Sequence, residues 1–172
     1  MSLDKPLDGG YKRRMNFRDR ASVFLATGLS IGKIPIAPGT FGTLLGIPIC
    51  FGLAELGAAG SIAGVVAFVL LAVQVAGRAE TLIGKKDAPV IVIDEVAGLL
   101  VTLAGLPLTP LNLAAGFAAF RVMDILKPFP ARRIDRKMTG GWGVVLDDVV
   151  AGIYSNILLR VIPLFFFQGA AS

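Results

Sequence analysis

Histidine is absent from this chain of 172 residues, and cysteine occurs once, at Cys50. The absence of histidine excludes phosphatases with a histidine nucleophile and every histidine-ligated zinc site. Cys50 has Leu56 six positions later, where a cysteine-phosphatase loop needs arginine, and no Asp-x-Asp pair or GxxxxGK[ST] phosphate loop occurs. Carboxylates, lysines, hydroxyls and a hard metal ion therefore remain as the groups available for chemistry at neutral pH.

Charge is scarce as well, because charged residues make up 17% of the chain and hydrophobic residues 55%. Roughly a quarter of the residues are charged in an ordinary soluble domain. No charged residue lies between Gly57 and Gly77, or between Val96 and Phe120. A helix needs about 20 apolar residues to cross a bilayer, so the first stretch fits one crossing. Prolines at 107 and 110 divide the second into two helices, and a buried helical hairpin of a soluble protein has the same pattern.

These patterns predict an all-α protein, a multi-helix integral membrane bundle. A polar leader is expected at residues 1–16, without the apolar run of a cleavable signal peptide, and a single helical domain at residues 17–172. The domain is expected to contain an N-terminal amphipathic helix at 17–29 and about four to five apolar helices. The apolar helices are predicted at residues 41–56, 61–77, 90–105, 111–125 and 144–167, the first of which either crosses the bilayer or lies shallowly against it.

If these helices alternate across a bilayer, the loops at 30–40, 78–89 and 126–143 emerge on one face. These loops carry many cations, namely Lys33, Arg78, Lys85, Lys86, Lys127, Arg132, Arg133, Arg136 and Lys137. The positive-inside rule places that face in the cytoplasm. The net charge of +5 is not accompanied by a nucleic-acid-binding module, so we expect contacts with anionic membrane lipids and none with nucleic acid.

Acidic residues gather at helix ends on that same predicted face. Asp94 and Glu95 open the helix at 90–105, Asp124 ends the helix at 111–125, and Asp147 and Asp148 open the last helix. Carboxylates beside apolar spans are costly and repel one another unless a cation neutralises them. Oxygen ligands suit Mg²⁺ or Mn²⁺, so these five residues are the predicted metal ligands and catalytic acids. The alternative is that each acid pairs with a nearby cation at a helix boundary or favours the helix dipole.

Two further segments are predicted to bind phosphate. Arg121 lies one turn before Asp124 and is suited to bidentate binding of a phosphate, and Lys127 adds a positive charge further along. Gly39 and Thr40 belong to a Gly-rich segment before a helix, where free backbone N–H groups attract anions. Capping of that helix by Thr40 or Thr43 explains the segment equally well.

Five segments in order resemble the phosphatidylglycerophosphatase A family, between about residue 21 and residue 160: IAPGTFGT, IDEVAG, FRVMDILKPFP, a GG-x-G turn and DDVVAG. The resemblance implies Mg²⁺-dependent hydrolysis of phosphatidylglycerophosphate to phosphatidylglycerol and phosphate in the bacterial inner membrane. It also implies that the acidic clusters, Arg121, Lys127 and Asp135 belong to the site. Some relatives have a histidine before the segment of Asp94, where this chain has Lys85-Lys86-Asp87, so that histidine is not essential here.

The resulting hypothesis is attack by water on phosphorus, with Mg²⁺ held by some of the carboxylates and another acting as general base. Arg121 and Lys127 are expected to stabilise charge on the phosphoryl oxygens, and an aspartyl-phosphate intermediate is an open variant. A CDP-alcohol phosphotransferase is an alternative, although its Asp-rich run on one helix is missing. A divalent-cation or phosphate transporter is another, although it favours carboxylates at mid-membrane rather than at helix ends. The oligomeric state is left open.

Overall fold

The computed structural model describes residues 15–168, and the side chains of residues 15–162. Almost all of the expected leader at 1–16 lies outside the described residues. The described part contains seven α-helices, one short 3-10 helix and no strand, which confirms the all-α prediction. In chain order these are α1 (Phe17–Ala26), η1 (Ile31–Lys33), α2 (Pro38–Ala54), α3 (Gly57–Ile83), α4 (Ile93–Leu103), α5 (Pro110–Leu126), α6 (Ala131–Lys137) and α7 (Gly140–Gln168).

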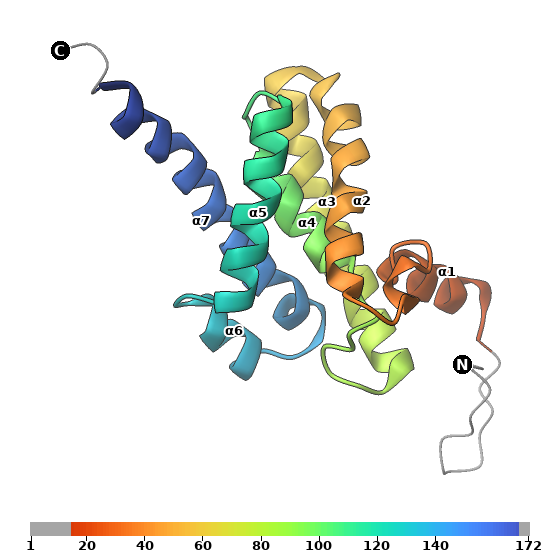
Figure 1. Ribbon diagram of the computed structural model, residues 1–172. Helices are drawn as coiled ribbons and strands as arrows, with labels where there is room; N and C mark the ends of the chain where they lie inside the picture. The colour runs from red at the N-terminus through yellow and green to blue at the C-terminus, as the bar shows by residue number, and fades with distance from the viewer. Residues whose placement is uncertain (1–14, 169–172) are drawn as a thin grey trace.

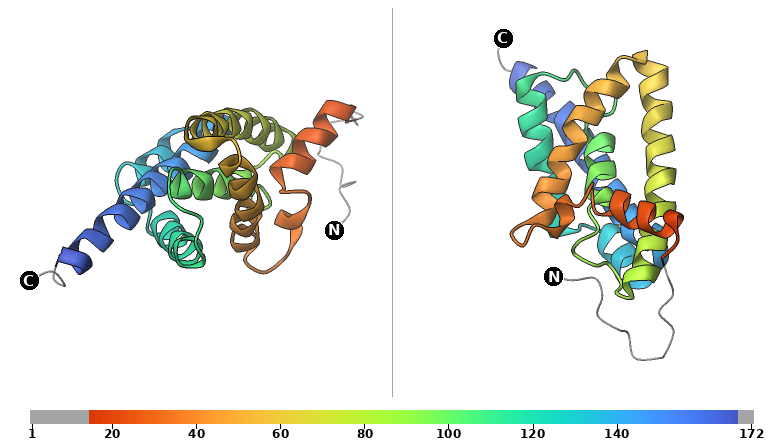
Figure 2. Two further views of the ribbon diagram at one scale, coloured as in Figure 1. Left: turned by 90° about the horizontal axis from the view of Figure 1, so that it is seen from above. Right: turned by 90° about the vertical axis from the view of Figure 1, so that its right-hand side faces the viewer.

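Helix α4 is the centre of the bundle, and it packs against α2, α3, α5 and α7 (Figures 1 and 2). All of its residues except Glu95 and Val101 are buried. Leu99 and Leu100 are almost completely enclosed, together with Phe120 of α5. The apolar character of this segment is therefore explained by packing inside the protein, since a helix surrounded by other helices is hydrophobic on every side.

The prediction of a crossing helix at 90–105 is wrong. Helix α4 has 11 residues, and at roughly 1.5 Å per residue it is about 16 Å long, whereas a bilayer core is about 30 Å thick. The chain enters it at Val92, whose N–H donates to the Ala26 carbonyl over 2.9 Å, and leaves it before Gly105, which has a positive φ of 67°. The buried-hairpin alternative is right for this half of the apolar stretch.

Helix α3 is the one described helix that is both long and apolar enough to cross a membrane, and α2 is a shorter apolar helix. The sequence predicted about four to five apolar helices, whereas one described helix meets the length and composition needed to cross a membrane. Only 22% of the most apolar window of α3 is buried, and Ile62, Val66 and Leu70 expose about half of their surface. The packed core of this protein therefore does not account for the apolar surface of α3.

Three predicted connections are partly helical. The loop expected at 30–40 ends earlier, because α2 begins at Pro38 and proline is well suited to the first turn of a helix. The charged connection expected at 78–89 starts later, since α3 continues to Ile83 and ends at Gly84 with φ 70°. The loop expected at 126–143 contains α6. Helix α1 begins at the predicted Phe17, where Asn16 and Asp19 form a capping box, and ends earlier, at Ala26.

Glycines bring α4 and α7 into backbone contact. A Cβ atom at Gly152 of α7 would lie 2.5 Å from the carbonyl oxygen of Gly98 in α4. A Cβ atom at Gly98 would in turn lie 3.0 Å from the carbonyl oxygen of Asp148 and would clash with the ring of Phe120. This contact holds the N-terminal half of α4 against α7, with Asp94 one turn before Gly98 and Asp148 one turn before Gly152.

Candidate active site

Three connections meet at one end of the bundle, the lower end in Figure 1: the segment before α2, the α3–α4 loop, and the region from the end of α5 through α6. The ammonium group of Lys86 in the α3–α4 loop donates to the backbone carbonyl of Asp135 in α6, over 2.7 Å. The three loops predicted to share a face thus lie at the same end, and the first turns of α4 and α7 lie there too.

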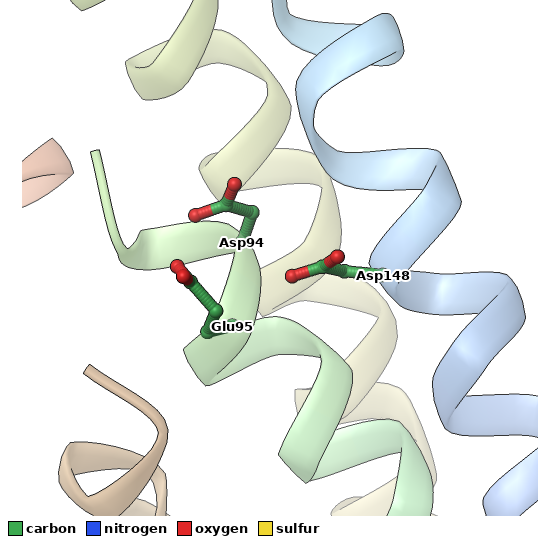
Figure 3. A group of neighbouring side chains, drawn as sticks. All are labelled: Asp94, Glu95 and Asp148. Carbon is green, nitrogen blue, oxygen red and sulfur yellow. The ribbon is translucent and has the colours of Figure 1, made fainter. Parts of the chain in front are cut away.

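Asp94, Glu95 and Asp148 form an acidic triad at this end. One carboxylate oxygen from each lies within 4.8 Å of the other two, and Asp148 reaches from α7 toward the two α4 residues (Figure 3). Asp94 is 6% exposed and Asp148 is 3% exposed. Asp94 Oδ1 and Glu95 Oε2 are buried without a hydrogen-bond partner. Buried polar atoms are nearly always paired, so these unpaired oxygens indicate a ligand that the protein alone does not supply.

The triad fits a hard divalent cation. Burial disfavours three negative charges, and their mutual repulsion disfavours them further, unless a positive charge lies between them. The donor set consists only of carboxylate oxygens, which suit Mg²⁺ or Mn²⁺ and are poor ligands for soft metals.

Arg121 and Asp124 of α5 lie beside the triad. Arg121 Nη1 donates to Asp124 Oδ2 over 2.7 Å and lies 4.0 Å from Glu95 Oε1, so one guanidinium is shared by two acids. This ion pair is the one that the pairing alternative describes for Asp124, and phosphate binding by Arg121 stays a prediction. A Cβ atom at Gly39 would lie 3.2 Å from Arg121 Nη1 and would clash with Glu95 Oε1. The N-terminal turn of α2 thus lies against Arg121 and Glu95, and phosphate binding by Gly39 stays a prediction.

Lys127 connects the site to α6. This residue ends α5 in a left-handed conformation with φ 44°, and its Nζ donates to Asp147 Oδ2 and lies 3.5 Å from Asp135 Oδ1. Burial lowers the pKa of Lys127, but the hydrogen bond and charge of Asp147, together with the charge of Asp135, outweigh burial and raise the pKa above its usual value. Lys127 is therefore a permanent cation at neutral pH.

The structure separates the five predicted metal ligands into three groups. Asp94, Glu95 and Asp148 come together, whereas Asp124 is bonded to Arg121 and Asp147 to Lys127. Asp147 Oδ1 is nevertheless buried without a hydrogen-bond partner. The pairing alternative thus describes Asp124 and one oxygen of Asp147, and within the triad it describes Glu95 through its contact with Arg121, but not Asp94 or Asp148.

Threonine does not cap α2. The N-cap position is Ala37, which makes no side-chain capping bond, and the buried hydroxyl of Thr43 donates to the Gly39 carbonyl over 2.8 Å. Thr40 lies inside the first turn of the helix, directly after Gly39. The capping interpretation of the two threonines is therefore wrong, and Thr40 stays a predicted phosphate contact.

Asp87 is a neighbour of the site that the sequence reasoning missed. It lies in the α3–α4 loop, and although the residue as a whole is exposed, desolvation of its carboxyl raises its pKa. Asp135 and Asp124 raise this pKa further, and Lys127 opposes them, so all four groups share one electrostatic environment. The available signal was an acid in an otherwise lysine-rich loop shortly before the acidic start of α4.

Comparison with known proteins decides the family. Residues 24–163 match the family model described as Phosphatidylglycerophosphatase A. The chain belongs to the phosphatidylglycerophosphatase A family. It is 37% identical over 139 residues to phosphatidylglycerophosphatase A of Escherichia coli, covering 80% of this chain and 81% of the relative. It is 38% identical over 146 residues to the Haemophilus influenzae protein of that name, covering 80% and 86%.

A third relative bears a different name. A Bacteroides thetaiotaomicron protein, assigned provisionally as a phosphatidylinositol-3-phosphatase, is 36% identical over 147 residues, covering 81% of this chain and 91% of the relative. No solved structure shows significant similarity to the chain. Membership of the phosphatidylglycerophosphatase A family confirms the resemblance found in the sequence motifs, and it makes the chain a phosphatase. It does not favour the transferase or the transporter.

Proposed function

We propose that the protein hydrolyses phosphatidylglycerophosphate to phosphatidylglycerol and inorganic phosphate. The observation that carries this proposal is the buried triad of Asp94, Glu95 and Asp148, with unpaired oxygens, flanked by two cations in a chain of this family. Two of the relatives are named for this activity. A phosphomonoester needs a positive environment around its oxygens, and the site supplies such an environment beside a group of acids.

Mg²⁺ is the proposed cofactor, and Asp94, Glu95 and Asp148 are the residues that would hold it. When bound, such an ion polarises phosphate oxygens and lowers the pKa of water. Asp124 and Asp147 complete the predicted acidic set from positions that touch Arg121 and Lys127. Their role here is to orient those two cations toward the substrate phosphate.

In the proposed reaction, the oxygen of a water molecule attacks phosphorus, and the bond between phosphorus and the glycerol oxygen breaks. Arg121 and Lys127 bind the phosphoryl oxygens, on which negative charge is concentrated in the transition state. A carboxylate takes the proton of the attacking water, and we assign this role to Asp147, because its Oδ1 is buried and unpaired. The departing glycerol oxygen receives a proton from solvent, and Asp147 then releases to solvent the proton that it took, so that one water is consumed for each phosphate released.

We also propose that the protein is integral to the bacterial inner membrane, with its site facing the cytoplasm. Apolar side chains point outward from several long helices, including Phe51 of α2, Ile62 and Val66 of α3, and Ile157 of α7. The acidic site lies at the end of the bundle that also carries the basic loops. The positive-inside rule assigns this end to the cytoplasm.

Phosphate release from phosphatidylglycerophosphate by the purified protein in neutral detergent tests the proposal. We expect release with Mg²⁺, none with EDTA, and recovery when Mg²⁺ is added back. Asp148→Asn is expected to abolish release, and Glu55→Gln is the matched control, because Glu55 is an exposed acid that follows α2. Folded wild-type protein that releases no phosphate with Mg²⁺ would contradict the proposal. Release of CMP from a CDP-linked lipid, or cation flux in proteoliposomes, would then support the transferase or the transporter.

A further inference from the structure

A basic groove lies against the proposed site. It has a volume of about 470 Å³ and is formed by the end of α5, the turn that follows, and α6. Five of its lining residues are basic, namely Lys127, Arg132, Arg133, Arg136 and Lys137. Leu126 and Phe129 supply apolar surface, with exposed fractions of 58% and 73%. The groove therefore offers several cations beside exposed hydrocarbon, which is the chemistry of a lipid head group and its attached chains.

The groove is held in place by bonds to the rest of the molecule. Tyr154 of α7 donates its hydroxyl to the Phe129 carbonyl over 2.7 Å, which ties the turn to α7. Arg132 Nη2 donates to the Leu126 carbonyl over 3.2 Å, which ties α6 to the end of α5. Lys86 holds α6 from the other side through the Asp135 carbonyl. The concave surface is thus fixed by contacts with α7 and the α3–α4 loop and by one bond between its own two helices.

Apart from Lys127, the cations of the groove have no acidic partner in the described part of the chain. Asp135 is the single acid of α6, and it lies beside Lys127. Arg132, Arg133, Arg136 and Lys137 form no salt bridge with any described residue. Four positive charges on one concave surface repel one another, and an anion in the groove would remove that repulsion.

Lys127 belongs both to the groove and to the proposed site, because its Nζ is bonded to Asp147. An anion in the groove would therefore lie one side chain away from the reacting phosphate. Phosphatidylglycerophosphate carries two anionic groups, the terminal phosphomonoester that is hydrolysed and an internal phosphodiester one glycerol unit away. We propose that the basic groove binds the internal phosphodiester while the phosphomonoester enters the acidic site. This inference rests on the proposed function and adds to it a basis for substrate selection.

Each of the two reaction products can be used as an inhibitor that probes one of the two subsites. Phosphatidylglycerol keeps only the phosphodiester, and inorganic phosphate represents only the phosphomonoester. The variant is Arg133→Gln/Arg136→Gln, in which both side chains are exposed. The matched control is Arg18→Gln/Arg20→Gln, which removes the same charge from exposed residues of α1. All proteins are assayed in neutral detergent at one detergent concentration, so that an anionic bilayer contributes nothing.

For the groove variant we expect KM for phosphatidylglycerophosphate to rise about tenfold, because the loss of two exposed ion pairs together contributes about this factor. We expect kcat to stay within about twofold. Inhibition by phosphatidylglycerol should weaken by a similar factor, and inhibition by inorganic phosphate should not change. The α1 control should behave as wild type, and Arg133→Lys/Arg136→Lys should restore most of the affinity.

Several results would overturn the inference. An unchanged KM would show that the groove does not contact the substrate. An equal weakening of inhibition by inorganic phosphate would show that the groove binds the phosphomonoester or free phosphate instead. An equal rise of KM in the α1 control would show that the overall positive charge of the protein attracts the anionic substrate, without a specific contact in the groove. Direct titration of phosphatidylglycerol binding to each variant needs no turnover, so it tests the groove even if phosphatidylglycerophosphate is not the substrate.

Discussion

The two ends of α4 differ in whether their polar atoms have hydrogen-bond partners. At the first turn, Asp94 and Glu95 keep buried carboxylate oxygens without a hydrogen-bond partner. At the last turn, the backbone carbonyls that a helix end leaves free are covered by α7. Asn156 Nδ2 donates to the carbonyls of Thr102 and Ala104 over 2.8 and 3.0 Å, and Arg160 Nη2 donates to those of Ala104 and Gly105 over 3.0 and 3.1 Å.

Both ends face the same helix, since Asp148 and Asn156 are about two turns apart on α7. At the last turn, the Asn156 amide and the Arg160 guanidinium supply hydrogen bonds to the free carbonyls. At the first turn, Asp148 adds another negative charge to the unpaired carboxylates. A buried network that is fully paired stabilises a fold, whereas one that is left unpaired costs stability and signals a ligand. We therefore infer that the end of α4 near Asn156 stabilises the fold, and that the end near Asp148 binds a ligand and takes part in the reaction.

The largest expected effect is that of Asp148→Asn on catalysis. Asparagine keeps the shape and removes one charge of the triad, so we expect kcat to fall by roughly 10³-fold, as when preorganised electrostatic groups are lost. The free energy of unfolding should not fall, because a buried charge repelled by its neighbours has been removed. Turnover and urea unfolding in micelles measure the two quantities. If the variant loses stability as well as turnover, Asp148 also has a structural role, and the two ends of α4 do not differ in function.

Asn156→Ala should show the reverse pattern. The substitution leaves the Thr102 carbonyl without its side-chain donor and the Ala104 carbonyl with Arg160 alone, which costs about 2–3 kcal/mol of unfolding free energy. The kcat of the folded fraction should match wild type, because Asn156 lies at the far end of α4. Denaturant titration and active-fraction assays check this. Arg160→Gln is the milder control, since the hydrogen bonds of Arg160 are exposed. Loss of kcat at full stability would contradict the structural assignment.

The smallest expected effect is stabilisation by Mg²⁺. At ten times its dissociation constant, an ion that binds only the folded protein adds about 1.4 kcal/mol of stability. We expect this gain in wild type and in Asn156→Ala, and its loss in Asp148→Asn. Thermal unfolding with Mg²⁺ and with EDTA measures it without any substrate. An equal gain in Asp148→Asn would place the metal away from the triad.

Local chemistry made much of this arrangement predictable. The sequence showed that Asp94 and Glu95 open a helix, and that Arg121 and Asp124 lie one turn apart. Asp147 and Asp148 were expected to open the last helix, but α7 begins at Gly140 and the two acids lie about two turns inside it. Helix α4 was misread because an apolar run has the same composition whether lipid or protein surrounds it. Helix α6 was missed because its seven residues are mostly basic and carry little apolar periodicity.

The selection within the acidic set needed three dimensions. Asp124 and Asp148 look alike in sequence, and only the packing of α5 and α7 gives a cation to one and two more acids to the other. Asp87 joins this environment through a loop whose path no local pattern specifies. The sequence thus indicated which acidic residues belong to the candidate site, and the helix packing determined which of them pair with cations and which gather in the triad.

The contact between Gly98 and Gly152 gives the site an unusual kind of vulnerability. The gap between the carboxylates of α4 and that of α7 is set by main chain resting on main chain, with no side chain that adjusts its rotamer. A single added methyl group at either glycine moves one acid away from the other two. We therefore expect these two positions to tolerate substitution as poorly as the acids themselves, even though neither glycine carries a reactive group.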